Sequence, residues 1–414
     1  MLFLLTSFEH MQHSPSPQLG LKANLGQFML LVAVNAFVGA MVGLERVIIP
    51  VLAGTRWGVE SYVAALSFII TFGMAKALAN SVAGRLAERA GRKRLLILGW
   101  LLGIPVPLIL MWAPSWAWVV AANALLGLNQ GFAWTMTVVM KIDLVGPKQR
   151  GLALGINESA GYAAVSLAAL LSGFWLAAGH EEWAFTAGLV IALVGLVVSL
   201  VAVHDTMDHV ALEQGAAAKE ASPSWGSVFQ RVSWKERHLH AASQAGLVNN
   251  MNDGLAWGIL PLFFLQVGMG EENTAWLLAA YPLIWGLGQL FTGGLSDRIG
   301  RRGPIAVGMI LQGVSILWLL EASSWTGYAV SMVGMGIGTA LVYPTLLAVI
   351  SDHSEPIWRS TALGVYRLWR DGGYVVGAVL AGLLADALNP ESAILWIGVL
   401  TIASGCWAGW LLRS

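Results

Sequence analysis

Residues 84–93 of this chain read GRLAERAGRK, and residues 293–302 read GGLSDRIGRR. The two segments carry glycines, an acidic residue and several basic residues at equivalent positions, 209 residues apart. Three further pairs of identical residues keep the same offset: Asp143 and Asp352, Arg150 and Arg359, and Gly155 and Gly364. The chain is therefore an internal duplication, and its repeated element is a charged loop between apolar segments.

The composition indicates a membrane protein. Apolar residues make up 57% of the chain and charged residues only 11%, whereas a soluble domain carries about 25% charged residues. Crossing the hydrocarbon of a bilayer takes about 20 helical residues, and the sequence lacks the alternating pattern of a barrel. We predict an all-α polytopic protein with twelve transmembrane helices, at residues 26–53, 61–83, 95–113, 116–140, 151–178, 183–205, 239–267, 273–292, 304–321, 325–350, 359–387 and 391–412.

The duplication divides these helices into two sets of six. Six helices return the chain to the side on which it started, so the repeats are parallel and related by an axis along the membrane normal. Within the connection between them, residues 225–234 are predicted to form an amphipathic helix. The expected organisation is a disordered tail at 1–23, a six-helix bundle at 24–205, a cytoplasmic linker at 206–238 and a second six-helix bundle at 239–414.

Basic residues predict the orientation in the membrane. If both termini lie on one side, the loops and tails of that side hold 18 of the 23 Lys and Arg residues, and the opposite loops hold Arg56. Cytoplasmic loops carry such an excess, so we expect both termini in the cytoplasm. The net charge of zero gives no indication of a nucleic-acid partner.

The sequence offers few groups for metal, redox or catalytic chemistry. Cys406 is the one cysteine, which excludes an intramolecular disulfide. The histidines fall outside the cores of the predicted helices, and motifs for nucleophilic catalysis or nucleotide binding are absent. We expect no enzyme activity, no cofactor and no metal site.

The repeated loop resembles motif A of the major facilitator superfamily. Its pattern, G-x-L-[AS]-[DE]-R-x-G-R-[KR], stands between the second and third predicted helices and again between the eighth and ninth. Together with the 6+6 arrangement, the resemblance covers residues 24–412 and is to bacterial twelve-helix permeases. It implies a monomer in the bacterial cytoplasmic (inner) membrane, surrounded by the lipid bilayer, that moves a small-molecule substrate by alternating access.

The charged loops are candidates for a cytoplasmic gate. Glu88 and Arg92 are four residues apart, as are Asp297 and Arg301, so each pair can meet on one helical turn. In the superfamily such a network joins the two halves when the protein opens outward and breaks when it opens inward. An alternative is that these charges only fix the orientation in the membrane. The candidate gate residues are Gly84, Glu88, Arg89, Gly91, Arg92, Asp143 and Arg150, with Gly293, Asp297, Arg298, Gly300, Arg301, Asp352 and Arg359 in the second half.

Ionisable residues at bilayer depth cost roughly 2.5–3.5 kcal/mol or more and normally face a cavity. The resemblance places all of those found here on helices that line or flank the central cavity. We expect Arg367 to pair with Asp371, Glu158 to face Arg367 across the repeat axis, and Lys76 to extend to the cytoplasmic water. The set is Glu45, Arg46, Lys76, Glu158, Asp253, Arg367, Arg370 and Asp371.

Two interpretations of these charges stay open. In one, they are structural ion pairs between helices. In the other, an arginine (Arg46, Arg367 or Arg370) binds an anionic substrate group and a carboxylate (Glu158, Asp253 or Glu45) carries a coupling proton. The polar run 249–254 predicts a locally broken helix at cavity depth, with hydrogen bonding between helices as the alternative. Further substrate-site candidates are Asn129, Gln130, Asn249, Asn252 and Tyr343.

We therefore expect a secondary transporter of a small organic solute, with an anion as one candidate, coupled to the proton gradient. Residues 155–162 read GINESAGY and lack the Gly-Pro that is typical of drug/proton antiporters, although drug or metabolite efflux stays an alternative. A sensor or assembly protein with the same fold but without transport is a second alternative. The short loops leave no room for a sizeable soluble domain, which favours transport.

Overall fold

A computed structural model describes residues 17–146, 150–214, 223–355 and 358–413. Helices dominate these ranges, and no strand occurs in them. The elements are α1 (Leu25–Trp57), α2 (Tyr62–Ala90), α3 (Arg92–Gly103), α4 (Pro105–Trp112), α5 (Trp116–Asn129), η1 (Gln130–Trp134), α6 (Thr135–Val145), α7 (Arg150–Ala177), α8 (Glu182–Val201), α9 (Met207–Gln214), α10 (Trp225–Gln230), η3 (Arg231–Lys235), α11 (Arg237–Gln266), α12 (Gly270–Ile299), α13 (Arg302–Glu321), α14 (Trp325–Asp352), α15 (Arg359–Ala387) and α16 (Pro390–Leu411).

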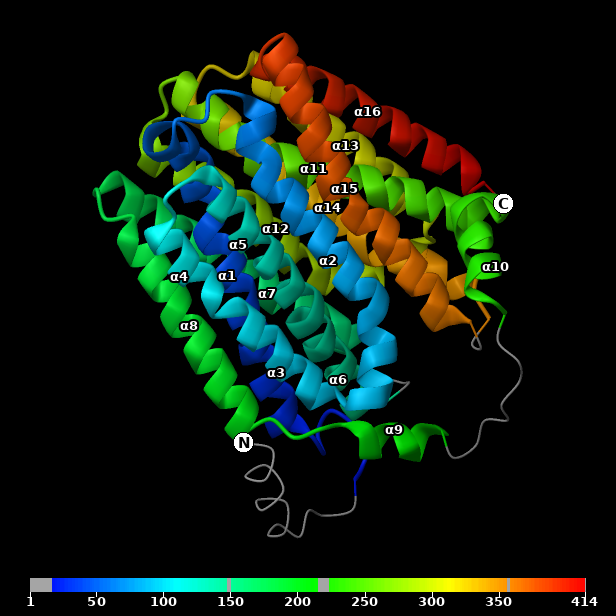
Figure 1. Cartoon of the computed structure of the whole chain (residues 1–414). Coiled ribbons are helices and arrows are strands. Elements are labelled where there is room, and N and C mark those ends of the chain that lie inside the picture. Colours follow the sequence, from blue (N-terminus) through cyan, green and yellow to red (C-terminus); the bar gives the residue numbers. More distant parts are fainter. Residues whose placement is uncertain (1–16, 147–149, 215–222, 356–357, 414) are drawn as a thin grey trace.

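The predicted all-α fold is confirmed, and its helices form two bundles (Figure 1). The first bundle runs from α1 to α8 and the second from α11 to α16, while α9 and α10 belong to the connection between them. Within the described ranges, nine helical spans are long and apolar enough to cross a membrane. The remaining three predicted spans correspond to α11 and α15, which carry more polar residues, and to the segment from α5 to α6.

Two predicted spans are interrupted. α3 ends at Gly103 and α4 begins at Pro105, a residue that lacks an N–H donor and fits the first turn of a helix. Between α5 and α6, the residues of η1 form a single π-helical turn, a feature that is frequent at functional sites. The break predicted at 249–254 is wrong, because α11 is continuous through these residues.

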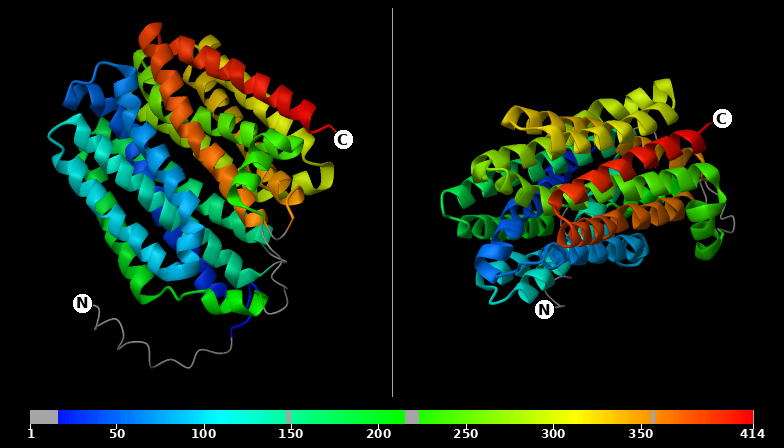
Figure 2. Two further views of the ribbon diagram at one scale, coloured as in Figure 1. Left: turned by 45° about the vertical axis from the view of Figure 1, so that its right-hand side comes forward. Right: turned by 90° about the horizontal axis from the view of Figure 1, so that it is seen from above.

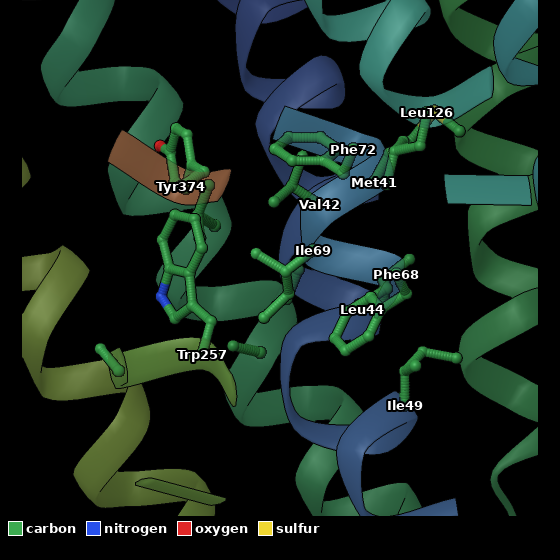
Figure 3. Close-up of a cluster of buried hydrophobic side chains, with 14 of the residues drawn as sticks. Met41, Val42, Leu44, Ile49, Phe68, Ile69, Phe72, Leu126, Trp257 and Tyr374 are labelled. Carbon is green, nitrogen blue, oxygen red and sulfur yellow. The ribbon is translucent and has the colours of Figure 1, made fainter. Parts of the chain in front are cut away.

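The two bundles contact each other from the middle of their helices to one end of the molecule. We call the end that carries the start of α1, the end of α16 and the linker helices the terminal face, and the opposite end the distal face. Toward the distal face one buried apolar cluster includes residues of both bundles. Part of it is seen in Figure 3, where Trp257 and Tyr374 of the second bundle lie opposite Ile69 and Phe72 of the first.

Toward the terminal face the apolar clusters are separate. One contains residues of the second bundle and its linker helix, from Val228 to Leu412. Another contains Phe28, Val32, Val145 and Ala153 of the first bundle. Figure 1 shows the consequence, since the bundles approach each other at the upper left and spread apart toward α9 and α10. The protein is therefore open toward its terminal face.

Two helix pairs, α2 with α15 and α7 with α12, form most of the contact between the bundles, which lie side by side in both views of Figure 2. Small residues permit this close approach. A Cβ atom added at Gly173 would overlap Cβ of Ala275, and one added at Gly382 would lie 2.8 Å from Cα of Val63. Larger side chains at these glycines would force the bundles apart.

The repeated glycines of the charged loops have a backbone reason. Gly91 follows α2 with a φ angle of 90°, and Gly300 follows α12 with a φ angle of 85°. Glycine adopts this region without the steric cost that other residues incur. Each glycine lets the chain turn from one membrane helix directly into the next.

Candidate functional site

A small cavity of about 30 Å³ lies between the bundles, at the middle of their helices. That volume holds about one water molecule, because long side chains such as those of Lys76 and Arg367 occupy the remaining space. The π-helical turn η1 contributes two of the lining residues. The lining consists of Lys76, Asn80, Gln130, Trp134, Thr135, Leu154, Glu158, Tyr162, Tyr343, Leu347, Arg367 and Arg370.

Hydrogen bonds beside this cavity cross between the bundles twice. Tyr343 accepts a bond from Nη1 of Arg370 (2.6 Å) and donates one to Oε2 of Glu158 (3.4 Å). Oδ1 of Asp371 accepts bonds from Nε and Nη2 of Arg370 (2.8 and 2.6 Å). Its Oδ2 accepts a bond from Nδ2 of Asn80 (2.6 Å). These contacts join α7 to α14 and α2 to α15 at the level of the cavity.

The two ion pairs expected for Arg367 do not form. Its Nε atom has no hydrogen-bond partner among the described residues. Asp371 bonds to Arg370, the next residue in the chain, and Glu158 accepts a bond from Nε1 of Trp134 (3.0 Å). The predicted close ion pair with Asp371 is therefore wrong, because Arg370 takes this carboxylate, whereas Glu158 and Asp371 attract Arg367 only from a greater distance. Arg367 still lines the same cavity as Glu158 and Arg370.

Lys76 also lies differently from the prediction. Its ammonium group lines the cavity instead of reaching the terminal face. Nζ lies 5.2 Å from the ring centroid of Tyr374, 5.6 Å from that of Phe72 and 5.9 Å from that of Trp134. Ring faces attract cations at such distances, and this attraction holds Lys76 inward. Within the described part of the chain, no hydrogen bond or ion pair engages it.

Glu45 and Arg46 are neighbours in α1 but have different surroundings. Oε2 of Glu45 accepts a bond from Nδ2 of Asn123 (2.9 Å) inside the first bundle. Arg46 is 2% exposed, and its Cζ lies 4.4 Å from the ring centroid of Phe72 and 4.9 Å from that of Trp257. None of its three side-chain nitrogens has a hydrogen-bond partner in the described part of the molecule. Arg46 is thus a buried cation in contact with ring faces.

Asn249 and Asn252 join helices inside the second bundle. Nδ2 of Asn252 donates to Oε1 of Gln312 (3.0 Å), and its Oδ1 accepts from Oγ1 of Thr401 (2.8 Å). Oδ1 of Asn249 accepts from Nε2 of Gln312 (3.0 Å). These bonds hold α11 to α13 and α16, which corresponds to the alternative of hydrogen bonding between helices. The structure does not bring the two asparagines to the cavity.

Three other candidates, Asp253, Asn129 and Gln130, form hydrogen bonds with neighbouring helices, and of these only Gln130 lines the cavity. Oδ1 of Asp253 accepts a bond from the hydroxyl of Tyr281 (2.6 Å), and its buried Oδ2 has no partner among the described residues. Nδ2 of Asn129 donates to a backbone carbonyl of α3 (2.8 Å), away from the cavity. Nε2 of Gln130 donates to a backbone carbonyl of α1 (2.7 Å) while the residue lines the cavity.

The first charged loop forms an ion pair within its own bundle. Nε of Arg92 lies 3.2 Å from Oδ2 of Asp143, which also accepts a bond from Oγ1 of Thr206 (2.7 Å). The loop is thereby tied to the end of α6 and to the start of the linker. The side chains of Glu88 and Arg150, both assigned to the gate, lie outside the described part of the structure.

The second charged loop forms the complete expected set of contacts. Arg301 bonds to Asp297, and its Nε lies 3.0 Å from Oδ2 of Asp352. Burial alone would lower the pKa of Arg301, but these two bonds outweigh it and hold the pKa above its usual range. Arg359 donates to the carbonyl oxygen of Ser354 (3.1 Å) instead of joining the set. The contacts persist although the terminal face is open, so they do not have to break for the bundles to separate there.

The distal face holds a contact that the sequence analysis missed. Asp386, in the last turn of α15, accepts bonds from Oγ of Ser61 (2.7 Å) and from the backbone N–H groups of Tyr62 (2.6 Å) and Val63 (3.0 Å). These donors belong to the first turn of α2, where backbone N–H groups lack partners inside the helix. Nε2 of Gln266 in α11 also donates to the hydroxyl of Tyr62 (2.7 Å). Asp386 and Gln266 thus join the two bundles at the distal face, and the sequence contains no pairing signal for either residue.

The fold and the site together define a class of protein. Two parallel six-helix bundles enclose a charged cavity at mid-membrane depth, an arrangement found in secondary transporters. In the described ranges, no group of three or more His, Cys, Asp and Glu residues is placed to hold a metal ion. The family model of the Major Facilitator Superfamily matches residues 25–239 and 243–414. The chain belongs to this superfamily, and it is an integral membrane protein.

Relatives and a solved structure agree with this assignment. The inner membrane transport protein YnfM of Escherichia coli is 26% identical over 35% of this chain and 35% of its own length. The chain thus spans about a third of that relative. A probable 4-methylmuconolactone transporter of Cupriavidus pinatubonensis is 25% identical over 75% and 73% of the two lengths. The fold is similar to that of a bacterial Spinster homolog in an inward-facing, unoccupied conformation, with a TM-score of 0.72, 14% identity and coverage of 93% and 96%.

Proposed function

We propose that this protein transports a small organic anion by alternating access, as a monomer in a bacterial cytoplasmic membrane, coupled to protons. The observation that carries the proposal is the unbalanced charge beside the cavity. Three cations, Lys76, Arg367 and Arg370, stand against two carboxylates, Glu158 and Asp371, and only Arg370 forms an ion pair within 4 Å among the described residues. Glu158 and Asp371 attract Lys76 and Arg367 from a greater distance, which leaves one positive charge in excess. A buried cation normally has a partner, and a substrate anion supplies it.

The cavity is smaller than a usual site for an organic molecule. Ligand sites for organic molecules usually measure about 300–1,000 Å³, far more than the 30 Å³ found here. The flexible side chains of Lys76 and Arg367 fill the difference and must move aside when the anion binds. The name of the relative from Cupriavidus pinatubonensis, a probable 4-methylmuconolactone transporter, supports a small organic molecule as the solute.

Glu158 is the residue that we assign to proton coupling. It lies on α7 at the contact between the bundles, lines the cavity, and receives bonds from Trp134 and Tyr343. The bond to Tyr343 belongs to the opposite bundle, so relative movement of the bundles changes the surroundings of the carboxylate. Uptake of a proton by Glu158 raises the positive charge of the cavity and strengthens its attraction for an anion.

The terminal face is assigned to the cytoplasm because of its excess of Lys and Arg residues. The conformation described here is then inward-open, and the contacts of Asp386 belong to the closed outer side. Alternating access requires a second state in which the bundles meet at the terminal face and separate at the distal face. The two helix pairs α2–α15 and α7–α12, which we call the seams between the bundles, would supply the contact at the distal face in one state and at the terminal face in the other.

Flux into proteoliposomes tests the proposal. A panel of radiolabelled organic anions and cationic drugs is offered with and without a pH gradient. We expect anion flux driven by the gradient, which Lys76→Gln and Arg367→Gln reduce at least tenfold. The matched control, Lys235→Gln, changes an exposed lysine of the linker and should leave flux unchanged. Glu158→Gln should keep exchange of the anion but lose its drive by the pH gradient.

Three results would contradict this function. Flux of cationic drugs alone would favour an efflux antiporter. Anion flux that is indifferent to Lys76→Gln and Arg367→Gln would remove the cavity from the transport path. Gradient-driven accumulation by the Glu158→Gln variant would assign the coupling proton to another residue.

A further inference from the structure

A hollow of about 320 Å³ opens at the distal face, on the far side of the bundle contact from the charged cavity. This volume falls within the range of sites for organic ligands. The hollow is enclosed by the end of α1, the start of α2 and the end of α11. Its lining is mostly apolar and includes Pro50, Ala53, Ala65, Leu262 and Leu265.

The hollow lies in line with Arg46. On α1, Arg46 is four residues from Pro50, a spacing that puts both on one helix face. On α2, Phe68 and Phe72 follow Ala65 at intervals of three and seven, again on one face. On α11, Trp257 is eight residues before Leu265. The faces that line the hollow therefore continue inward to the rings around the Arg46 guanidinium.

Arg46 lacks the contacts that such a group requires. A buried guanidinium without hydrogen-bond acceptors is costly, because all its N–H groups lose their water. Ring faces compensate for only part of that loss. Nothing among the described residues bonds to Arg46. Glu45 and Asp253 attract the guanidinium without a hydrogen bond to it. A guanidinium without hydrogen-bond acceptors, about one helical turn inward from a ligand-sized hollow, points to an anionic group that binds there when the distal face opens.

We propose that Arg46 and its aromatic neighbours form a binding site for the carboxylate of a flat, conjugated organic acid that enters from the distal face. The proposal rests on the proposed function and adds the class of substrate to it. The guanidinium takes the two carboxylate oxygens. The ring of the acid stacks on the faces of Phe72, Trp257 and Tyr374, of which the last two are already parallel, with centroids 5.6 Å apart and planes inclined by 20°.

The same rings connect the Arg46 site to the charged cavity. Phe72 lies 4.4 Å from Arg46 Cζ and 5.6 Å from Lys76 Nζ, measured to its ring centroid. Tyr374 lies 5.2 Å from Lys76 and packs edge-on against Phe72. Aromatic residues thus separate two cations that stand in sequence along the axis of the protein. A planar acid can pass from one cation to the other with its ring in contact with aromatic faces throughout.

Equilibrium binding to the full chain in lipid nanodiscs tests the substrate class, with benzoate and cyclohexanecarboxylate as matched probes. The two have the same charge and similar size, but only benzoate has a conjugated ring. We expect benzoate to bind about 3- to 10-fold more tightly. Trp257→Leu should abolish this preference. Trp276→Leu, which changes an exposed tryptophan of α12, should keep it.

Variants of Arg46 test the carboxylate contact. Arg46→Gln should weaken benzoate binding about 10- to 100-fold, and Arg46→Lys, which keeps the charge, should weaken it less. Arg56→Gln is the matched control: Arg56 lies on the same helix, also contacts a tryptophan ring, and is exposed. It should bind benzoate as the wild type does.

Several results would overturn the inference. Equal binding of the two probes by the wild type would exclude a conjugated substrate, and this comparison needs no variant. Unchanged binding by a folded Arg46→Gln variant would exclude the carboxylate contact. Asp253→Asn could weaken benzoate binding as much as Arg46→Gln does, and the double variant could weaken it no further than either single variant. That result would show that Arg46 pairs with Asp253 inside the protein and not with the carboxylate of the ligand. Anion flux that depends on Lys76 but not on Arg46 or Trp257 would leave the proposed function intact and reject this site.

Discussion

Replacement of Asp386 by alanine is expected to favour a state that is open at the distal face. Asp386 accepts three hydrogen bonds from the first turn of α2 in the opposite bundle. These bonds are lost when the bundles separate at the distal face, so their free energy stabilises only the present conformation. Loss of a capping side chain at a helix N-terminus costs about 0.5–2 kcal/mol. Because Asp386 is exposed, we take about 1 kcal/mol, a roughly fivefold change in the ratio of the two states.

Distances between two spin labels across the terminal face measure this ratio. Arg94 on α3 and Gly303 on α13 are equivalent by the 209-residue offset and are exposed at that face. They would be changed to cysteine in a Cys406→Ser background, since Cys406 is the one natural cysteine and is exposed. Pulsed electron spin resonance should show long distances in the parent protein and a roughly fivefold increase of the short-distance population with Asp386→Ala.

Two further variants make the measurement decisive. Asp386→Asn keeps one acceptor oxygen but removes the charge, so its shift should be smaller than that of the alanine variant. Glu391→Ala changes an exposed carboxylate at the start of α16 on the same face and should leave the distances unchanged. Identical distance distributions for Asp386→Ala and Glu391→Ala would refute the assignment of Asp386 to closure of the distal face.

Two further variants test polar side chains that we regard as structural, and a third tests closure of the bundles along α2. Asn252→Leu removes two hydrogen bonds between helices of the second bundle, worth about 0.6–1.7 kcal/mol each. The midpoint of thermal unfolding should therefore fall, while transport per folded molecule should be unchanged. A selective loss of transport would show that Asn252 belongs to the substrate site. Asp352→Asn removes an exposed ion pair worth about 0–1 kcal/mol, and an unfolding midpoint lowered as far as that of Asn252→Leu would contradict this estimate. Gly84 is eleven residues from Gly73 on the face of α2 that packs on α15, with no atom within 4 Å of an added Cβ. Gly84→Leu should therefore fold normally, keep the two spin labels at the long distance and transport at least tenfold more slowly. Rapid transport by this variant would exclude closure of the bundles along α2.

The sequence was sufficient for the fold because membrane helices follow from apolar length. The predicted span 391–412 corresponds to α16 at Pro390–Leu411, and the span 273–292 lies within α12. The internal offset then gave the 6+6 arrangement, since each half returns to its starting side. Local breaks were harder to place. The polar run 249–254 stays helical because its side chains bond to neighbouring helices, whereas the break at η1 has no comparable signal in its sequence.

Pairing within the site depends on competition that spacing does not reveal. Arg367 and Arg370 are both within reach of Asp371 by sequence, and Tyr343 decides between them by bonding to Arg370. Lys76 could have extended to water, but ring faces hold it at the cavity. The choice of partner in each case depends on side chains from four or five helices. The rotation of each helix about its axis and its position along the membrane normal are set by packing, which residue spacing does not reveal. The contact of Asp386 depends in addition on the conformational state.

The two seams between the bundles differ in chemistry, and the difference bears on how the protein moves. The α2–α15 seam is held by directional bonds of Asp386 and Asp371. The described α7–α12 seam has one hydrogen bond, from Oγ of Ser166 to the carbonyl of Ala279 (2.7 Å). It also has two ring contacts, between Tyr162 and Trp285 with centroids 3.6 Å apart and between Phe174 and Trp276 with centroids 5.8 Å apart. Ring faces can slide and tilt without loss of contact, whereas directional bonds must break. If the bundles move as proposed, the α7–α12 contact therefore suits a pivot, and we expect the larger barrier at the directional bonds between α2 and α15.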